Sequence, residues 1–167
     1  DLLLKWNISE DVVEEAALAA HRLLFRQATA FASFDADGAV RAIDLDPDTA
    51  WSGAARQTPL ASFVVDLGRP YIVRALTLDT TPAPDDYPRA YQVCVSDDPA
   101  DWREPVASGH GSPGVTRVQF TPKAGRYIIV VLTEDAPQAR WSIYEVRFID
   151  PDSGRFALDL PRRNRAE

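Results

Sequence analysis

The sequence of 167 residues contains one cysteine and no methionine. The single cysteine, Cys94, excludes an internal disulfide, and in the alternating stretch 91–95 we expect it to be a small buried side chain. A catalytic thiol needs a nearby base, yet His21 falls in a predicted helix and His110 in a glycine-rich turn. Disulfide-free domains occur in reducing and oxidising compartments, so the cysteine count leaves the compartment open. A sequence that starts at Asp1 favours a piece processed or excised from a longer protein.

Positive charge and long apolar runs are also scarce. The formal net charge is −7 and the isoelectric point is about 4.8. A nucleic-acid partner requires clustered cations, and the one basic run, 162–165, is better interpreted as a solvated tail. No apolar run approaches the roughly 20 residues of a membrane-spanning helix. We therefore expect no nucleic-acid partner and no membrane insertion.

Length and composition indicate one globular domain. A chain of 167 residues is long enough to bury a hydrophobic core, and 46% of its residues are hydrophobic. The sequence contains 13 prolines together with 7 Phe, 5 Tyr and 4 Trp. Proline interrupts helices and aromatic side chains suit strands, so this composition favours a loop-rich β protein.

One amphipathic helix is predicted near the start of the chain. Asn7 and Glu10 have the spacing of an N-terminal cap, in which each side chain satisfies a free backbone N–H of the first turn. Strong helix formers run from Ser9 to about Gln27, with acidic residues in the first turns and basic residues in the last, as the helix dipole favours. The apolar stripe of this helix consists of Val13, Ala17, Ala20 and Leu24.

After residue 27 the hydrophobic pattern changes to period two, and no second helix of this kind is predicted. The predicted strands are 29–34, 61–67, 72–79, 90–96, 115–120, 126–133 and 142–149. Clusters of Pro, Gly and Asp separate them, which predicts an all-β fold with an antiparallel β-sandwich. We divide the chain into a helical appendage or linker (1–27), the sandwich (28–150) and a C-terminal tail (151–167).

Five segments form a specific pattern when taken in order. They are the stretch 35–51, the strand 63–70, the hairpin 91–98 followed by Trp102, the segment 124–128 and the segment 141–146. In this order and spacing they resemble the coagulation factor 5/8 type C (discoidin, galactose-binding-like) domain over about residues 28–150. Animal members usually close their termini with a disulfide that this chain cannot form. The resemblance is therefore strongest to the bacterial branch with family 32 carbohydrate-binding modules, and it implies a jelly-roll sandwich that binds its ligand through loops at one end.

An acidic loop is the one candidate for a metal site. Asp44, Asp46 and Asp48 alternate along it beside the Thr49 hydroxyl, and such hard oxygen ligands suit Ca²⁺. An EF-hand is excluded because its sixth and twelfth positions would be Thr49 and Ala55. The alternative is that the carboxylates only cap turns through Asx hydrogen bonds.

The resemblance narrows this choice. It implies a structural Ca²⁺ whose ligands are the Asp44 and Thr49 side chains, carbonyls near Arg41 and Asp46, and the Glu145 carboxylate. One residue departs from the family pattern, because Leu45 stands where the family prefers glycine for a left-handed turn.

The four tryptophans are predicted to be structural. Trp51, Trp102 and Trp141 match family positions that mostly pack against the sandwich. Trp6 precedes the helix, lies outside the resemblance and is expected to pin the helix to the sandwich.

Three loops between predicted strands are expected to contain the ligand-binding residues: 52–60, 80–89 and 134–140. Sugar recognition needs side chains that donate and accept hydrogen bonds beside an apolar platform. The predicted ligand-binding residues are Arg56, Gln57, Tyr87 and Arg140. The alternative for each is a solvated loop residue without a ligand.

These observations favour a non-catalytic carbohydrate-binding module of a larger secreted or surface protein. No nucleophile motif, zinc motif or phosphate loop is present, so no enzymatic activity is expected. The first alternative is a protein-interaction or structural domain whose helix docks onto a neighbouring domain. The second alternative is a domain that binds a lipid surface. Such domains use exposed apolar side chains surrounded by basic residues, which the loops of this acidic chain do not supply. The resemblance implies an extracellular, periplasmic or cell-surface location.

Overall fold

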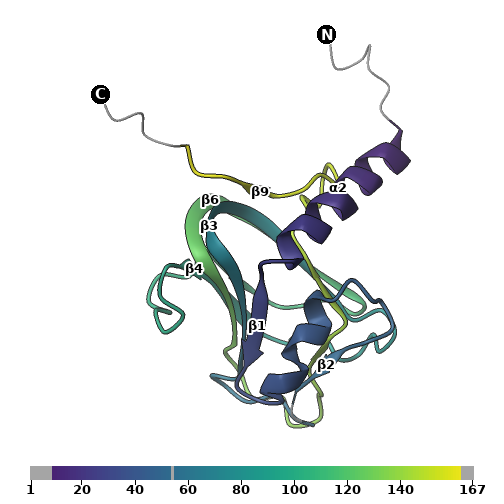
Figure 1. Cartoon of the computed structure of the whole chain (residues 1–167). Helices are drawn as coiled ribbons and strands as arrows, with labels where there is room; N and C mark the ends of the chain where they lie inside the picture. Colours follow the sequence, from purple (N-terminus) through teal and green to yellow (C-terminus); the bar gives the residue numbers. More distant parts are fainter. Residues whose placement is uncertain (1–8, 54, 163–167) are drawn as a thin grey trace.

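The computed structural model describes residues 9–53 and 55–162, and it confirms an antiparallel β-sandwich preceded by one α-helix. The helix α2 (Glu10–Phe25) packs beside one end of the sheets (Figure 1). The strands are β1 (Thr29–Ala32), β2 (Trp51–Ser52), β3 (Ser62–Asp79), β4 (Tyr91–Ser96), β5 (Ala107–Gly109), β6 (Val115–Leu132), β7 (Ser142–Ile143), β8 (Glu145–Arg147) and β9 (Leu158–Asp159).

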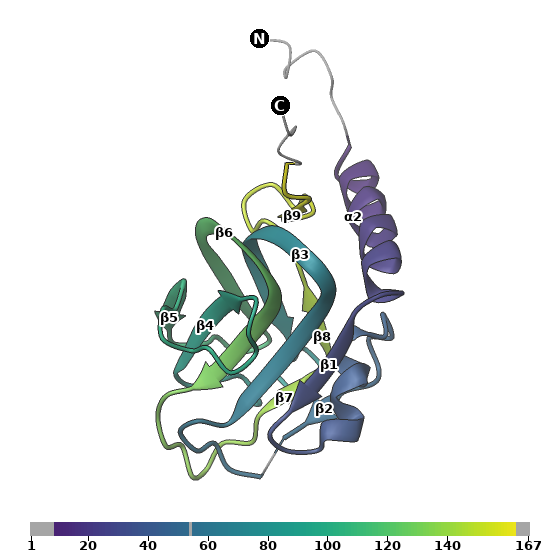
Figure 2. The same cartoon turned by 60° about the vertical axis from the view of Figure 1, so that its left-hand side comes forward.

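Two long bent strands form the frame of the sandwich. β3 and β6 pair antiparallel along most of their length, and the main sheet has the order β1-β3-β6-β4-β5. The prediction of four separate strands in these regions is wrong. The bulge between Asp66 and Tyr71 and the positive φ of Gly68 (82°) let β3 bend without ending. Each long strand therefore serves both layers, as Figure 2 shows.

The second layer contains short elements. β8 and β9 pair with the second half of β3, and β2 pairs with β7. A 3-10 helix, η1 (Ala36–Ile43), which the sequence pattern did not predict, connects β1 to the acidic loop. Its buried residues Ala39, Ala42 and Ile43 close one side of the core.

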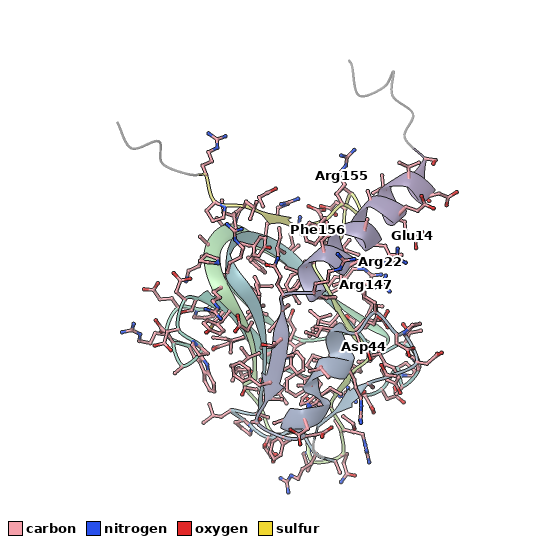
Figure 3. All side chains as sticks on the ribbon, viewed as in Figure 1. Glu14, Arg22, Asp44, Arg147, Arg155 and Phe156 are labelled. Carbon is pink, nitrogen blue, oxygen red and sulfur yellow. The ribbon has the colours of Figure 1, made fainter. Side chains whose placement is uncertain are left out.

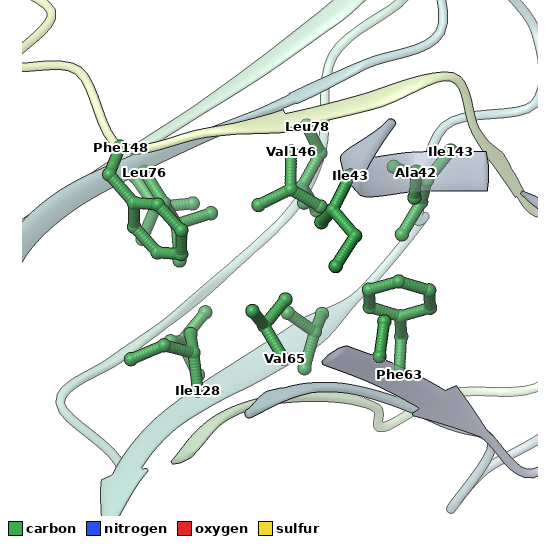
Figure 4. Packing of buried hydrophobic residues seen from close by; sticks show 14 of the residues in the cluster. Ala42, Ile43, Phe63, Val65, Leu76, Leu78, Ile128, Ile143, Val146 and Phe148 are labelled. Carbon is green, nitrogen blue, oxygen red and sulfur yellow. The ribbon is translucent and has the colours of Figure 1, made fainter. Parts of the chain in front are cut away.

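The core lies between the two layers. Trp51 and Trp141 are almost completely buried, and their rings meet edge to face with centroids 4.8 Å apart. The Trp51 indole also donates a hydrogen bond to the Phe34 carbonyl (2.8 Å). The side chains that face one another across the core in Figure 4 are Leu76, Val146 and Phe148 on one side and Phe63, Val65 and Ile128 on the other.

A smaller cluster covers the outer face of the main sheet. Val64, Cys94, Ile129 and Val131 form it, and Trp102 packs against it. Burial raises the pKa of the Cys94 thiol, so the expected role of this residue as a small buried side chain is confirmed.

Helix α2 packs against the sandwich through its buried residues Ala17, His21 and Leu24. Ala17 and Leu24 belong to the apolar stripe that the sequence predicted. His21 is 2% exposed. Its Nδ1 lies 2.6 Å from the Ala17 carbonyl, and its Nε2 accepts the Phe148 N–H at 2.8 Å. The helix begins after Ser9, which makes no side-chain cap, whereas Asn7 and Trp6 lie outside the described residues. Within the described residues, the model contains no helix with the length and apolar character that crossing a bilayer requires.

Candidate functional site

Three loops meet at the end of the sandwich away from α2, and one glutamine holds them together (Figure 2). Gln57 is 1% exposed. Its Nε2 donates to the carbonyls of Tyr87 (2.8 Å) and Arg140 (3.2 Å), while its Oε1 accepts the Arg89 N–H (2.9 Å). The backbone of Gln57 also exchanges hydrogen bonds with Ala136. Because one buried amide fixes residues of all three loops, the loops form a single positioned surface.

Two arginines display their guanidinium groups on this surface. Arg56 pairs with Asp135 (3.2 Å), and both side chains are about half exposed, with relative values of 56% and 52%. Arg140 is exposed and lies 3.5 Å from the Ser52 hydroxyl. An exposed charged pair such as Arg56–Asp135 contributes little to the stability of the fold.

An aromatic group lies in the middle loop. The Arg89 guanidinium stacks over the Tyr87 ring at 3.7 Å from its centroid and donates to the Tyr87 carbonyl (3.0 Å). The same loop is anchored by Asp86, which accepts the Ser142 hydroxyl at 2.9 Å. Tyr87 is half-buried, and the Arg89 guanidinium covers one face of its ring.

The structure thus places the four predicted binding residues in one region with different surroundings. Arg56 and Arg140 are exposed, Tyr87 is half-buried, and Gln57 is buried beneath them. Sequence reasoning missed Arg89 and Asp135. Arg89 follows Tyr87 by two residues and ends the same predicted loop, and Asp135 lies inside the loop 134–140. Their position in those loops was the available signal.

In the acidic loop (residues 44–49), several oxygen atoms surround the hydroxyl of Thr49. This Oγ1 contacts Asp44 Oδ2 and lies 3.3 Å from the Asp46 carbonyl and 3.5 Å from that of Arg41. Leu45 adopts the left-handed conformation with φ of 62°, so the side chain found in place of the family glycine does not prevent this turn.

The same loop contains the two Asx hydrogen bonds that the alternative reading requires. The Asp46 N–H donates to Asp44 Oδ1 (2.9 Å) and the Asp48 N–H donates to Asp46 Oδ1 (3.0 Å). These bonds use one oxygen of each carboxylate. The second oxygen of Asp44 is the one directed at Thr49.

Glu145 is buried and half satisfied. It is 3% exposed, and its Oε2 pairs with the Arg147 guanidinium at 2.7 Å. Its Oε1 is buried and has no hydrogen-bond partner among residues 9–53 and 55–162. A buried carboxylate oxygen without a partner is costly, and a hard cation is one group that satisfies it.

The carbonyl, hydroxyl and carboxylate oxygens of the acidic loop and the Glu145 carboxylate are of the chemical type that Ca²⁺ prefers. In the described part of the chain no three or more His, Cys, Asp or Glu side chains are grouped to hold a metal. A cation in this loop would thus depend largely on carbonyl and hydroxyl oxygens.

Comparison with known proteins defines the class. The sequence profile described as the F5/8 type C domain matches residues 27–146, and the chain belongs to this family. A search of curated proteins finds no match.

Solved structures of carbohydrate-binding modules share the fold. Chitosan-binding module 1 of the chitosanase/glucanase from Paenibacillus sp. IK-5 is 27% identical, with a TM-score of 0.62, covering 72% of this chain and 93% of that one. A family 32 module of NanJ from Clostridium perfringens, solved with galactose, is 21% identical, with a TM-score of 0.62 and coverage of 74% and 93%. Another Clostridium perfringens family 32 module, solved with GalNAc-β-1,3-galactose, is 21% identical, with a TM-score of 0.63 and coverage of 75% and 96%. This domain is thus homologous to carbohydrate-binding modules, as its sequence predicted.

Proposed function

We propose that this domain is a non-catalytic carbohydrate-binding module that holds a glycan on the loop surface fixed by Gln57. The observation that carries the proposal is the buried Gln57 amide, which joins three loops and leaves two exposed arginines above it. Sugar hydroxyls are recognised by such positioned donors, and a charged donor strengthens each hydrogen bond. The solved modules with bound galactose and GalNAc-β-1,3-galactose support this assignment.

We propose that the module attaches a larger protein to a glycan surface, because one site of this kind binds a glycan weakly. A shallow site of a few side chains gives low affinity, and a module of this kind acts by keeping a larger protein at a glycan surface. We accordingly propose a secreted or cell-surface setting as part of a longer protein. The domain itself performs no chemistry in this proposal.

Removal of the exposed guanidinium groups is expected to weaken sugar binding. In Arg56→Ala and Arg140→Ala each change removes a charge-assisted donor, which corresponds to a loss of about tenfold or more in affinity. Isothermal titration with an oligosaccharide found to bind the wild-type domain measures it. Arg117→Ala in β6 is the matched control, since Arg117 is exposed and lies outside the three loops. Unchanged affinity in both loop variants would place the sugar elsewhere.

We also propose that the acidic loop binds a structural Ca²⁺. The residues that would hold it are Asp44, Thr49 and Glu145 through their side chains, and Arg41 and Asp46 through their carbonyls. Two observations support the proposal: Glu145 Oε1 has no hydrogen-bond partner within the described part of the chain, and the Thr49 hydroxyl lies near the carbonyls of Arg41 and Asp46. When bound, the ion would neutralise the carboxylates and stiffen the connection between η1 and β2.

Calcium is expected to raise the melting temperature of the domain. An ion at one hundred times its dissociation constant adds about 2.7 kcal/mol, which raises the midpoint by several degrees. Differential scanning fluorimetry with Ca²⁺ or EDTA measures this shift. Asp44→Asn is expected to abolish it, whereas Asp48→Asn, which removes the same charge from a residue outside the ligand set, is expected to retain it. No shift in the wild-type protein would leave Asp44 and Asp46 as turn caps only.

A further inference from the structure

Helix α2 carries a second apolar stripe on an exposed face next to its buried face. It consists of Val12, Ala16, Ala19 and Leu23, and we call it the outer stripe. Val12 is 55% exposed and Leu23 is 62% exposed. The spacing of four, three and four residues is that of the inner positions in paired helices. A solvated helix face has no need of this pattern, so the outer stripe indicates a partner.

The region beside the outer stripe is apolar as well. Val12 and Ala16 line a cavity of about 400 Å³ whose far side includes Phe156, with Arg74 and Arg155 also lining it. The contact surface therefore extends from the helix onto the sandwich. Figure 3 shows Phe156 and Arg155 beside α2, on the side away from Arg22 and Asp44.

Charge on α2 selects the kind of partner. The acidic residues of the helix lie in its first half, and Arg22 lies in the last turn. Glu15 and Arg22, one heptad apart, both border the outer stripe on the same side. Across an antiparallel copy of α2, Glu15 of each helix lies near Arg22 of the other, whereas in a parallel copy Glu15 lies across from Ala20, which carries no charge. The charges on α2 are therefore complementary to those on a second copy of α2 that runs antiparallel to it.

We propose that two copies of this domain associate through an antiparallel pair of α2 helices, related by a two-fold axis. In this arrangement Val12 of each copy packs beside Leu23 of the other, and Ala16 lies opposite Ala19 at the centre. The two alanines let the helix axes approach closely. One surface serves both copies, as a two-fold interface requires.

The arrangement is compatible with the rest of the molecule. The outer stripe is separate from Ala17, His21 and Leu24, which attach α2 to the sandwich, so a second helix can lie along it without displacing that contact. The loop surface lies at the end of the sandwich away from α2 and stays open (Figure 2). Pairing makes the assembly bivalent, which raises the effective affinity for a glycan surface. The proposal itself does not depend on the ligand of that surface.

The test is sedimentation velocity of the whole chain from about 1 to 500 μM. A contact of one helix face is small for a protein interface, so we expect a monomer–dimer equilibrium with a dissociation constant on the order of 100 μM. Leu23→Glu, which places a charge in the outer stripe, is expected to leave only monomer. Leu160→Glu is the matched control, because Leu160 is 56% exposed and lies outside α2. Circular dichroism verifies that both variants are folded.

Charge exchange identifies the orientation. Glu15→Arg alone and Arg22→Glu alone are expected to weaken the dimer about fivefold or more, and the double exchange is expected to restore it. A monomer at every concentration, or a dimer that Leu23→Glu leaves unchanged, would overturn the proposal. Dimerisation without rescue by the double exchange would overturn the antiparallel pairing.

Discussion

Gln57→Ala is expected to destabilise the domain by about 3 kcal/mol and to abolish measurable sugar binding. The substitution removes three hydrogen bonds and leaves the Tyr87 and Arg140 carbonyls and the Arg89 N–H without their partner. Each buried group left unsatisfied costs about 1–3 kcal/mol, and some recover by contacting water. Because the amide joins the three loops, their relative positions are lost together, although the Gln57 side chain itself is buried beneath the surface.

Urea unfolding and sugar titration measure the two effects separately. Gln138→Ala is the matched control, since Gln138 is an exposed glutamine in the same group of loops and should cost less than about 0.5 kcal/mol. If Gln57→Ala unfolded at the wild-type urea concentration, the three loops would not depend on this residue. If it were destabilised yet bound sugar normally, the ligand would not require the loop surface.

The second large effect is expected at His21. Burial lowers the pKa of His21 below its ordinary value, and the positive charge of Arg147 acts in the same direction. His21 lines a cavity of about 630 Å³ whose charged lining residues are Arg147 on β8, Glu10 and Glu14 on α2, and Asp152 on the segment after β8. A neutral His21 accepts the Phe148 N–H, and protonation removes that acceptor.

The sign of the pH dependence follows from these protonation states. Near pH 7 both the folded and unfolded proteins hold His21 neutral. As the pH falls below about 6.5 the unfolded chain binds a proton that the folded protein does not, so stability decreases by up to about 1.4 kcal/mol per pH unit. The decrease continues until the pH reaches the lowered pKa of the folded state. The carboxyl whose pKa the Arg126 guanidinium lowers, Asp66, contributes only at more acid pH.

His21→Ala is expected to cost about 3 kcal/mol at pH 7 and to remove most of the pH dependence between pH 7 and 5. The substitution leaves a cavity among Phe25, Phe148 and Phe156 and deprives the Phe148 N–H of its acceptor. Chemical unfolding at several pH values measures both quantities. His110→Ala is the control, because His110 is exposed. A His21 variant with the same pH slope as the wild-type protein would contradict this role.

Most of the fold could be predicted from the sequence because its signals are local. Alternation marked the strands, and the apolar spacing marked the helix and its buried residues Ala17 and Leu24. Continuity of β3 and β6 could not be predicted, since a bulge near Gly68 has the same sequence pattern as a turn that ends a strand. The 3-10 helix η1 was missed because its short apolar spacing is stabilised by contacts with distant strands.

The sequence could predict which loops form the candidate site, but it could not predict how the side chains in those loops are arranged. Which loops meet was implied by the resemblance, whereas the place of each side chain depends on tertiary contacts. Gln57 is a polar residue in a polar loop, so the sequence predicted an exposed side chain. In the structure this side chain is buried and donates hydrogen bonds to the Tyr87 and Arg140 carbonyls. The left-handed backbone of Leu45 is a similar case, because the surrounding loop imposes a conformation that the residue type disfavours.

The central claim is that the loop surface binds a glycan, and a glycan-array screen of the whole chain with Ca²⁺ present tests it most directly. We expect reproducible binding to glycans that end in galactose-like or amino sugars, lost in a protein that combines Arg56→Ala and Arg140→Ala. An array without reproducible binding would contradict the claim, and so would binding that the double variant retains in full.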